Sequence, residues 1–143
     1  MKVMPETISI TTEQNEQVID ITKQVRDVVA RSAVRNGMLV VNSLHNTLAL
    51  FVNESQAALI HDLGTVLQKL LPRRAGYRHD DPHYSDCDRG NAHSHLRTML
   101  LGRSLSLPVV DGEPVLGQYQ SVLVAETDGP RTRQISVQVM GEE

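Results

Sequence analysis

Short apolar runs of strand length recur along this chain, and they constrain its fold more than any other feature. Residues 38–43 (MLVVNS) and 47–52 (TLALFV) are rich in β-branched and aliphatic side chains. They predict a continuous or tightly turned strand pair, with His45 near the junction. The alternating residues 7–12 and the short run 18–21 predict two further extended segments.

The last third of the chain predicts a β meander. Three runs that read as strands cover residues 104–110, 115–126 and 131–140. An Asp-Gly pair stands in each of the two connections between them, and Asp-Gly is typical of tight hairpin turns.

Three segments have the apolar spacing of helices. Each has its own start and stop signals. The first is capped by Thr22 and ended by Asn36-Gly37, the second runs from Ser55 to Leu71 and is closed by Pro72, and the third starts at Asn91 and stops at Gly102.

The order of these segments predicts an α+β fold with mixed β-sheets and about three helices. A length of 143 residues suits a single domain, over residues 1–143, with a core of its own. Aromatic residues make up only 3% of the chain, so we expect the core to be aliphatic.

The composition disfavours several classes of partner. A formal charge of −3 argues against a general nucleic-acid-binding protein, which is usually basic. No apolar run has the length of a membrane span, and residues 1–10 lack the apolar core of a signal peptide. The single cysteine, Cys87, fits a reducing compartment. We therefore expect a cytoplasmic protein that binds neither nucleic acid nor membrane.

A polar segment at residues 72–90 leads into a cluster of histidines. The segment is almost free of apolar residues, and long loops of this kind are often functional or mobile. Four of the six histidines, together with several aspartates, lie between residues 79 and 95. Imidazole and carboxylate groups bind metal ions and also perform acid–base catalysis. The cluster therefore indicates a site, although a solvated loop with incidental histidines is the alternative.

The two closest histidines, His93 and His95, point in different directions if the helix begins at Asn91. Residues two apart on a helix differ by about 200° in direction. One of the pair is expected to face a pocket and the other the core or an interface. Arg97 shares the face of His93, and with Ser94 and the amides of the helix start it could bind an anion. A solvated Arg97 and a plain helix cap are the alternative.

His45 allows two interpretations. It lies between two apolar strand runs, where a lone histidine is more often a hydrogen-bonded core residue than a ligand. The alternative is a site residue.

Four motifs resemble the YjbQ family, formerly an uncharacterised protein family and sometimes labelled secondary thiamine-phosphate synthase. They appear in the family's order and cover nearly the whole chain. The motifs are HNTLALFVNE (45–54), GNAHSHLRTMLLG (90–102), LPVVDGEPVLG (107–117) and ETDGPRTRQISVQVMGE (126–142). The resemblance implies an α+β domain that forms a homotrimer, a histidine-rich site for a divalent metal, and a weak thiamine-phosphate synthase activity.

The resemblance also turns His45 into an expected site residue. It implies that His45, His93 and His95 ligate the metal, which would be of the zinc or magnesium type, and that with Arg97 they form the catalytic set. Residues expected to bind substrate or phosphate are Thr47, Asn91, Ser94 and Gln120. This chain departs from the family pattern at Asn46, where the family has threonine, and at Tyr119, where it has tryptophan.

The sequence therefore predicts a metal-assisted enzyme that acts on a small phosphorylated molecule, with thiamine-phosphate synthesis as the named reaction. Two other functions stay open: a non-catalytic oligomer that binds a metal or an anion, and a metal-dependent phosphoester hydrolase.

Overall fold

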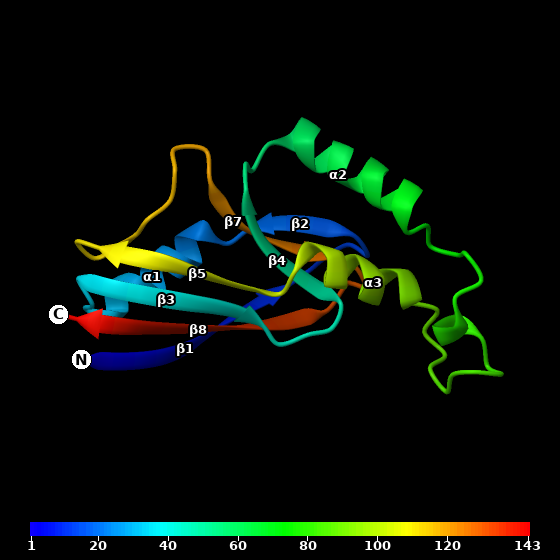
Figure 1. Cartoon of the computed structure of the whole chain (residues 1–143), viewed down its shortest axis with the longest axis horizontal. Coiled ribbons are helices and arrows are strands. Elements are labelled where there is room, and N and C mark those ends of the chain that lie inside the picture. Colours follow the sequence, from blue (N-terminus) through cyan, green and yellow to red (C-terminus); the bar gives the residue numbers. More distant parts are fainter.

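A computed structural model describes all residues from 1 to 143, and they form one α+β domain with two antiparallel sheets and three α-helices (Figure 1). The larger sheet has the strand order β1-β8-β3-β5-β6 and the smaller one β2-β7-β4. The strands of the larger sheet are β1 (Lys2–Thr11), β3 (Asn36–Ser43), β5 (Ser104–Val110), β6 (Glu113–Pro114) and β8 (Thr132–Glu142). Those of the smaller sheet are β2 (Gln17–Asp20), β4 (Leu48–Asn53) and β7 (Ser121–Glu126).

The helices are α1 (Thr22–Ser32), α2 (Ala57–Leu70) and α3 (Ala92–Leu101), and one turn of 3-10 helix, η1, covers Arg78–Asp80. All three predicted helices are present, and the end of the third at Gly102 is confirmed. The predicted end of the first helix is wrong. Ala33 takes the left-handed conformation that ends α1, and Asn36 and Gly37 already belong to β3.

The core is aliphatic, as the composition predicts. Sixteen buried residues form one cluster without an aromatic member. α1 supplies three of them, the residue just before it supplies a fourth, and the helix contacts strands of both sheets. The buried side chains of α1 and its start are Ile21, Val25, Val28 and Val29. Burying aliphatic side chains of this size is worth about 1.5–3 kcal/mol each, so α1 holds the two sheets together.

The predicted β meander is wrong, although its strands exist. Only the turn at Asp111-Gly112 makes a hairpin, between β5 and the two-residue β6. Both residues have positive φ, as a tight Asp-Gly turn requires. β7 instead pairs with β2 and β4 in the smaller sheet, so residues 127–131 cross from one sheet to the other. Turn residues alone do not determine which strands pair.

The predicted strand pair at 38–52 is wrong for the same reason. β3 and β4 belong to different sheets, and the chain between them, with His45, crosses the gap. The crossing at 44–47 and the crossing at 127–131 lie next to each other, because the Thr127 backbone N–H donates to the Thr47 carbonyl over 3.2 Å. Both bring polar backbone to one end of the molecule.

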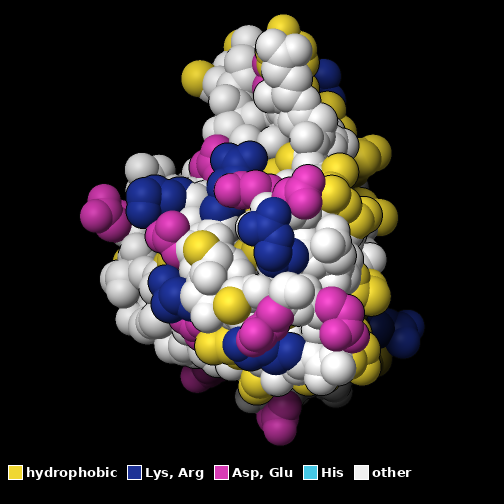
Figure 2. Space-filling view, turned by 90° about the vertical axis from the view of Figure 1, so that its left-hand side faces the viewer, with side chains coloured by type: hydrophobic (Ala, Val, Ile, Leu, Met, Phe, Trp, Pro, Cys, Tyr) yellow, Lys and Arg dark blue, Asp and Glu magenta, His cyan; other side chains and the backbone are white.

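The two ends of the fold differ in character. At one end β1 and β8 bring the N- and C-termini side by side (Figure 1). The face at this end carries interspersed basic and acidic side chains (Figure 2). Lys2–Glu143 and Arg35–Asp111 are ion pairs of residues near the termini, the start of β3 and the β5–β6 turn. At the other end the 72–90 segment projects beyond the sheets and leads into α3. No helix of the structure is both long enough and apolar enough to cross a membrane.

Two glycines give opposite predictions for substitution by alanine. A methyl group on Gly37 would lie 2.0 Å from the Met140 carbonyl oxygen across the β3–β8 pairing, whereas Gly64 in α2 has nothing within 4 Å. We expect Gly37→Ala to lower the free energy of unfolding by about 1–3 kcal/mol or more. Gly64→Ala should raise it by about 0.5–1 kcal/mol, because alanine favours a helix interior. Urea unfolding curves of both variants test this, and equal effects would contradict the close packing at Gly37.

Candidate functional site

A buried ion pair between Arg133 and Glu126 lies at the centre of the histidine-bearing end. The Arg133 side chain is 1% exposed and that of Glu126 is fully buried. Arg133 Nε donates to Glu126 Oε1 over 2.8 Å, and its terminal nitrogen also donates to Glu126 Oε2. The Thr12 hydroxyl donates to the same carboxylate over 2.7 Å. Burial by itself raises the pKa of Glu126, but these hydrogen bonds outweigh burial and hold the pKa below its ordinary value.

The position of Arg133 follows from strand alternation. In β8 every second residue faces the core, and Arg133 occupies the row that continues with Ile135, Val137 and Val139. Sequence reasoning missed Glu126 and Arg133 because both were assigned only to strands, on either side of a turn at residues 127–130, and no charged pair was expected between them. A carboxylate at the end of the apolar run VLVA and an arginine before another such run were the available signal.

Thr47, expected to bind substrate, is buried and belongs to this network. Its hydroxyl accepts from Arg133 over 2.8 Å, and its carbonyl accepts from the Thr127 hydroxyl over 2.6 Å. The structure therefore gives Thr47 a role in fixing the crossing between β3 and β4.

His45 lies beside this network and is half-buried. Its Nε2 accepts a hydrogen bond from the Gln134 backbone N–H over 2.9 Å. The other ring nitrogen, Nδ1, has no partner in the chain and is not buried. Burial lowers the pKa of His45, and the positive charge of Arg133 lowers it further. The ring is therefore a neutral imidazole near pH 7.

α3 separates its two histidines, as its geometry predicts. His93 is 2% exposed and lies on the buried side of the helix with Arg97. His93 Nε2 lies 3.3 Å from the Ser94 hydroxyl, and Nδ1 is buried without a hydrogen-bond partner. Burial lowers the pKa of His93, and the charges of Arg97 and Arg73 lower it further.

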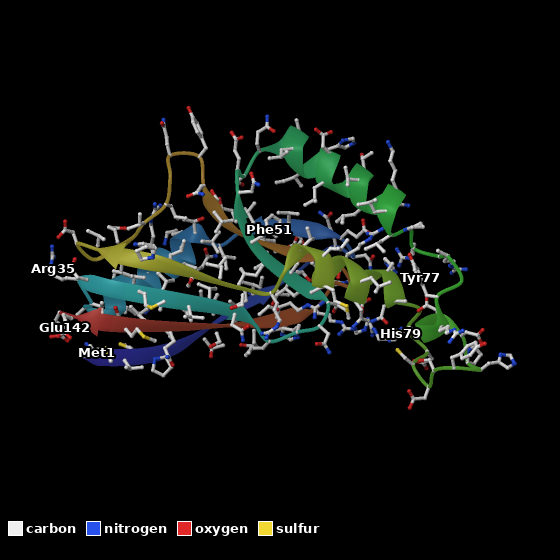
Figure 3. All side chains as sticks on the ribbon, in the orientation of Figure 1. Met1, Arg35, Phe51, Tyr77, His79 and Glu142 are labelled. Atoms are coloured by element: carbon white, nitrogen blue, oxygen red, sulfur yellow. The ribbon has the colours of Figure 1, made fainter.

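His95 faces the other side of α3, towards the space that His45 also faces. The two histidines line one hollow of about 470 Å³, together with Thr98, Met99 and Arg103. We call this space the histidine hollow. The His95 ring also lies against His79, with 4.8 Å between the ring centroids. Burial and then the neighbouring His79 lower the pKa of His95. Figure 3 shows His79 where the 72–90 segment meets the rest of the fold.

Arg97 is held by the chain itself. Its guanidinium donates to the Leu71 carbonyl over 3.1 Å, to Glu16 Oε1 over 2.8 Å and to Gln68 Oε1 over 3.2 Å. The side chain is 3% exposed. A phosphate bound here would have to displace the Glu16 carboxylate.

The free backbone N–H at the start of α3 also has a hydrogen-bond partner within the chain. The Ala92 backbone N–H donates to Asp80 Oδ1 over 3.0 Å, so a carboxylate already occupies the predicted anion position. Asn91 is the N-cap residue, but its side chain makes no capping bond and donates to Asp128 Oδ2 over 2.8 Å. The expectation of a capping side chain is therefore wrong. The Ser94 hydroxyl donates to the Thr127 carbonyl.

Asp128 binds two arginine side chains to which sequence reasoning assigned no role. Arg89 and Arg131 each donate to its Oδ2 over 3.0 Å, beside the bond from Asn91. Burial raises the pKa of Asp128, but the bonds from Arg89 and Asn91 outweigh it and lower the pKa. Asp128 therefore ties the 72–90 segment to the crossing between β7 and β8.

Gln120 lies far from these residues within one chain. It is on the exposed connection between β6 and β7, which rises above the sheets in Figure 1, well away from the 72–90 segment. Its Oε1 accepts from the Gly117 backbone N–H over 2.8 Å, and it lines a separate hollow with Asp20 and Arg26.

The three histidines predicted to ligate a metal do not converge. No group of three or more His, Cys, Asp or Glu side chains is arranged to hold a metal ion. His45 already uses the Nε2 lone pair, and the buried His93 lies outside the histidine hollow. The residues of one chain therefore do not fit the expected three-histidine site.

The lowered histidine pKa values predict a loss of stability in mild acid. In the unfolded chain His45, His93 and His95 take up protons as the pH falls through about 6.5. In the folded protein they stay neutral to lower pH, so the unfolded state binds more protons. We expect the free energy of unfolding to be highest above pH 6.5 and to fall as the pH drops towards the folded-state values.

Urea unfolding between pH 7.5 and 5 measures this slope. His95→Gln removes one of the three groups and should make the slope shallower. His61→Gln, at an exposed position of α2, controls for loss of a histidine as such. A stability that stays constant from pH 7.5 to 5 would contradict the neutral state of the histidines.

Comparison with known proteins covers nearly the whole chain. The family model described as UPF0047 protein YjbQ-like matches residues 6–142. A UPF0047 protein of Methanothermobacter thermautotrophicus is 40% identical over 142 residues, which cover 99% of this chain and 95% of the relative. The UPF0047 protein YugU of Bacillus subtilis is 26% identical over 139 residues, covering 96% of this chain and all of the relative.

Solved structures give the same result. A YbjQ-like protein of Sulfolobus solfataricus superposes with a TM-score of 0.90 at 32% identity and covers 99% of both chains. A YjbQ/UPF0047 protein of Clostridium acetobutylicum superposes with a TM-score of 0.85 at 31% identity, covering 94% of this chain and 99% of that one. The motifs, the fold and the matches agree, and the chain belongs to the YjbQ/UPF0047 family.

Proposed function

We propose that this protein is an enzyme for a small phosphorylated molecule, and that the reacting part of the molecule binds in the histidine hollow. One observation carries the proposal. His45 and His95 come from distant parts of the sequence and line the same hollow. Each has at least one ring nitrogen, Nδ1 in the case of His45, that is neither buried nor bonded within the chain. Neutral imidazoles in a partly closed hollow can donate, accept and move protons near neutral pH.

A second hollow offers a place for the phosphate. Arg73, Arg74 and Arg89 line a space of about 560 Å³ that includes the backbone of Gly76 and Gly90. Guanidinium groups match phosphate oxygens in charge and geometry. Asp80 and Asp81 share the lining, and they moderate the positive charge.

The 3-10 helix η1 lies between the two hollows. The His79 ring lies against His95, which lines the histidine hollow. The next residue, Asp80, lines the second hollow, the one with Arg73, Arg74 and Arg89. A molecule of modest size that extends along η1 would place a phosphate among the arginines and its reacting end near the histidines.

Thiamine-phosphate synthesis is the first reaction to test, because the family resemblance implies it. A ring nitrogen of the thiazole phosphate forms a bond to the pyrimidine methylene carbon, and the bond from that carbon to the diphosphate oxygen breaks. The diphosphate leaves with the electron pair. The chain's contribution would be hydrogen bonds from His45, His95 and Arg103 to the leaving oxygens, which stabilise the charge as it develops. A divalent metal stays a prediction, and no step here passes through it.

We also propose that the protein acts as a homotrimer. α2 has a stripe of apolar side chains, yet only Leu67 of this helix is buried in one chain. Leu59, Val66 and Leu70 are between 40% and 64% exposed. Exposed apolar patches of this kind usually mark contacts between proteins. A neighbouring copy would cover the stripe.

The histidine hollow gives a prediction for catalysis. His95→Leu removes the hydrogen-bond donor and should lower kcat for thiamine-phosphate formation by about 100-fold or more, a typical effect of losing one donor to a developing negative charge. The melting temperature should stay close to that of the wild type, because His95 makes no hydrogen bond from its ring. The assay contains the pyrimidine diphosphate, the thiazole phosphate and Mg²⁺, with phosphate release from simple esters measured in parallel.

His61→Leu, at an exposed position of α2, is the matched control and should keep full activity. Turnover of a phosphoester alone would favour the hydrolase. If neither reaction is detected in the wild type, or if His95→Leu matches it, the histidine hollow is not a catalytic site and a binding function is favoured.

Assembly can be tested separately. Light scattering at micromolar concentration should report the mass of three chains. Val66→Lys adds a charge to the exposed stripe of α2 and should shift the mass towards one chain, while Lys69→Glu alters the charge at an already polar position. A monomeric wild type would contradict the trimer.

A further inference from the structure

The hydrogen bond from Gln134 to His45 replaces a missing bond of the larger sheet. β3 pairs with β8 as far as Ser43 and Ile135. One residue further, the Leu44 backbone N–H still donates to the Gln134 carbonyl over 3.2 Å. The reciprocal bond would run from the Gln134 N–H to the Leu44 carbonyl, but the His45 ring takes its place. Nε2 therefore stands where a strand carbonyl would be.

This bond decides which ring nitrogen of His45 carries the proton. A backbone N–H can only donate, so Nε2 must present its lone pair. A neutral imidazole has one N–H group, and it must then be on Nδ1. Nδ1 is the nitrogen without a partner in the chain, and the ring lines the histidine hollow.

We propose that His45 is a hydrogen-bond donor, fixed in the Nδ1–H form by the Gln134 backbone, and that it binds an oxygen acceptor of the ligand instead of a metal ion. Metal ligation needs a lone pair on a ring nitrogen. In His45 the lone pair of Nε2 is used by the sheet, and Nδ1 carries the proton. Gln134 is thus a positioning residue that acts through its backbone.

The neighbours of His45 indicate the class of acceptor. Arg103 lines the same hollow, and its guanidinium also donates to Asn42 Oδ1 over 2.6 Å. A donor N–H beside a guanidinium suits a phosphoryl oxygen. For the identity of this oxygen, though not for the proton position, the inference rests on the proposed function.

Nuclear magnetic resonance of the full-length ¹⁵N-labelled protein at pH 7.5 tests the proton position directly. Long-range ¹H–¹⁵N correlations distinguish the two neutral forms of histidine, and the signals that disappear in His45→Gln belong to His45. We expect the proton on Nδ1, and we expect this pattern to persist when Zn²⁺ is added. A proton on Nε2, or loss of the Nδ1 proton with Zn²⁺, would overturn the inference.

Inorganic phosphate is the probe for the acceptor. It should shift the His45 Nδ1 proton signal, and its dissociation constant should rise by about tenfold or more in His45→Leu. His45→Gln keeps an acceptor for Gln134 and a donor for the ligand, so it should bind more tightly than His45→Leu. Absence of a phosphate-dependent shift in the wild type would exclude the donor role. These readouts require no turnover, so they separate this inference from the proposed function.

Discussion

The ion pair of Arg133 and Glu126 holds together the end of the molecule on which the rest of the structure depends. It joins the start of β8 to the end of β7, and through Thr12 and Thr47 it also fixes the end of β1 and the crossing from β3 to β4. Removing one partner of a buried pair leaves an uncompensated charge, which typically costs about 3–5 kcal/mol. Replacing both partners by apolar residues can be neutral, so the pair is best understood as a device that fixes geometry.

The candidate site depends on the same geometry through Gln134, the residue that follows Arg133 in β8. Arg133 points its side chain into the pair, while the backbone of Gln134 holds His45. Two successive residues of β8 therefore fix the crossing segment 44–47 at both of its ends. The position of His45 relative to α3 is set by the core, although the hollow itself opens to solvent.

Local structure could be predicted well from the sequence, and pairing could not. The stripe of α2 and the Gly102 stop of α3 are local signals, so these helices were found. Strand partners depend on which faces are buried across the whole chain, and the Asp-Gly turn before β8 looks the same whether the chain stays in one sheet or crosses to another. His93 and His95 were correctly predicted to point to different sides of α3. The prediction needs only helix geometry, in which residues two apart differ by about 200° in direction.

The polar partners of the site were beyond local reasoning. Arg97 and the start of α3 were expected to attract an external anion, but Glu16 and Asp80, from distant parts of the chain, occupy both. Such pairs follow from tertiary structure. Gln120 shows the converse: motifs that occur together in a family need not meet within one chain.

The place of β8 in the larger sheet has a consequence for biosynthesis. β8 lies between β1 and β3, although it begins only at Thr132, whereas β1 ends at Thr11 and β3 at Ser43. While a ribosome is still making residues 132–142, β1 and β3 have no partner on the facing edges, and unpaired edges invite association with other chains. Contacts between such distant residues also form slowly, because a long loop must close first. The nascent chain therefore stays vulnerable until β8 emerges, and chaperones that shield exposed strand edges should engage it before that point.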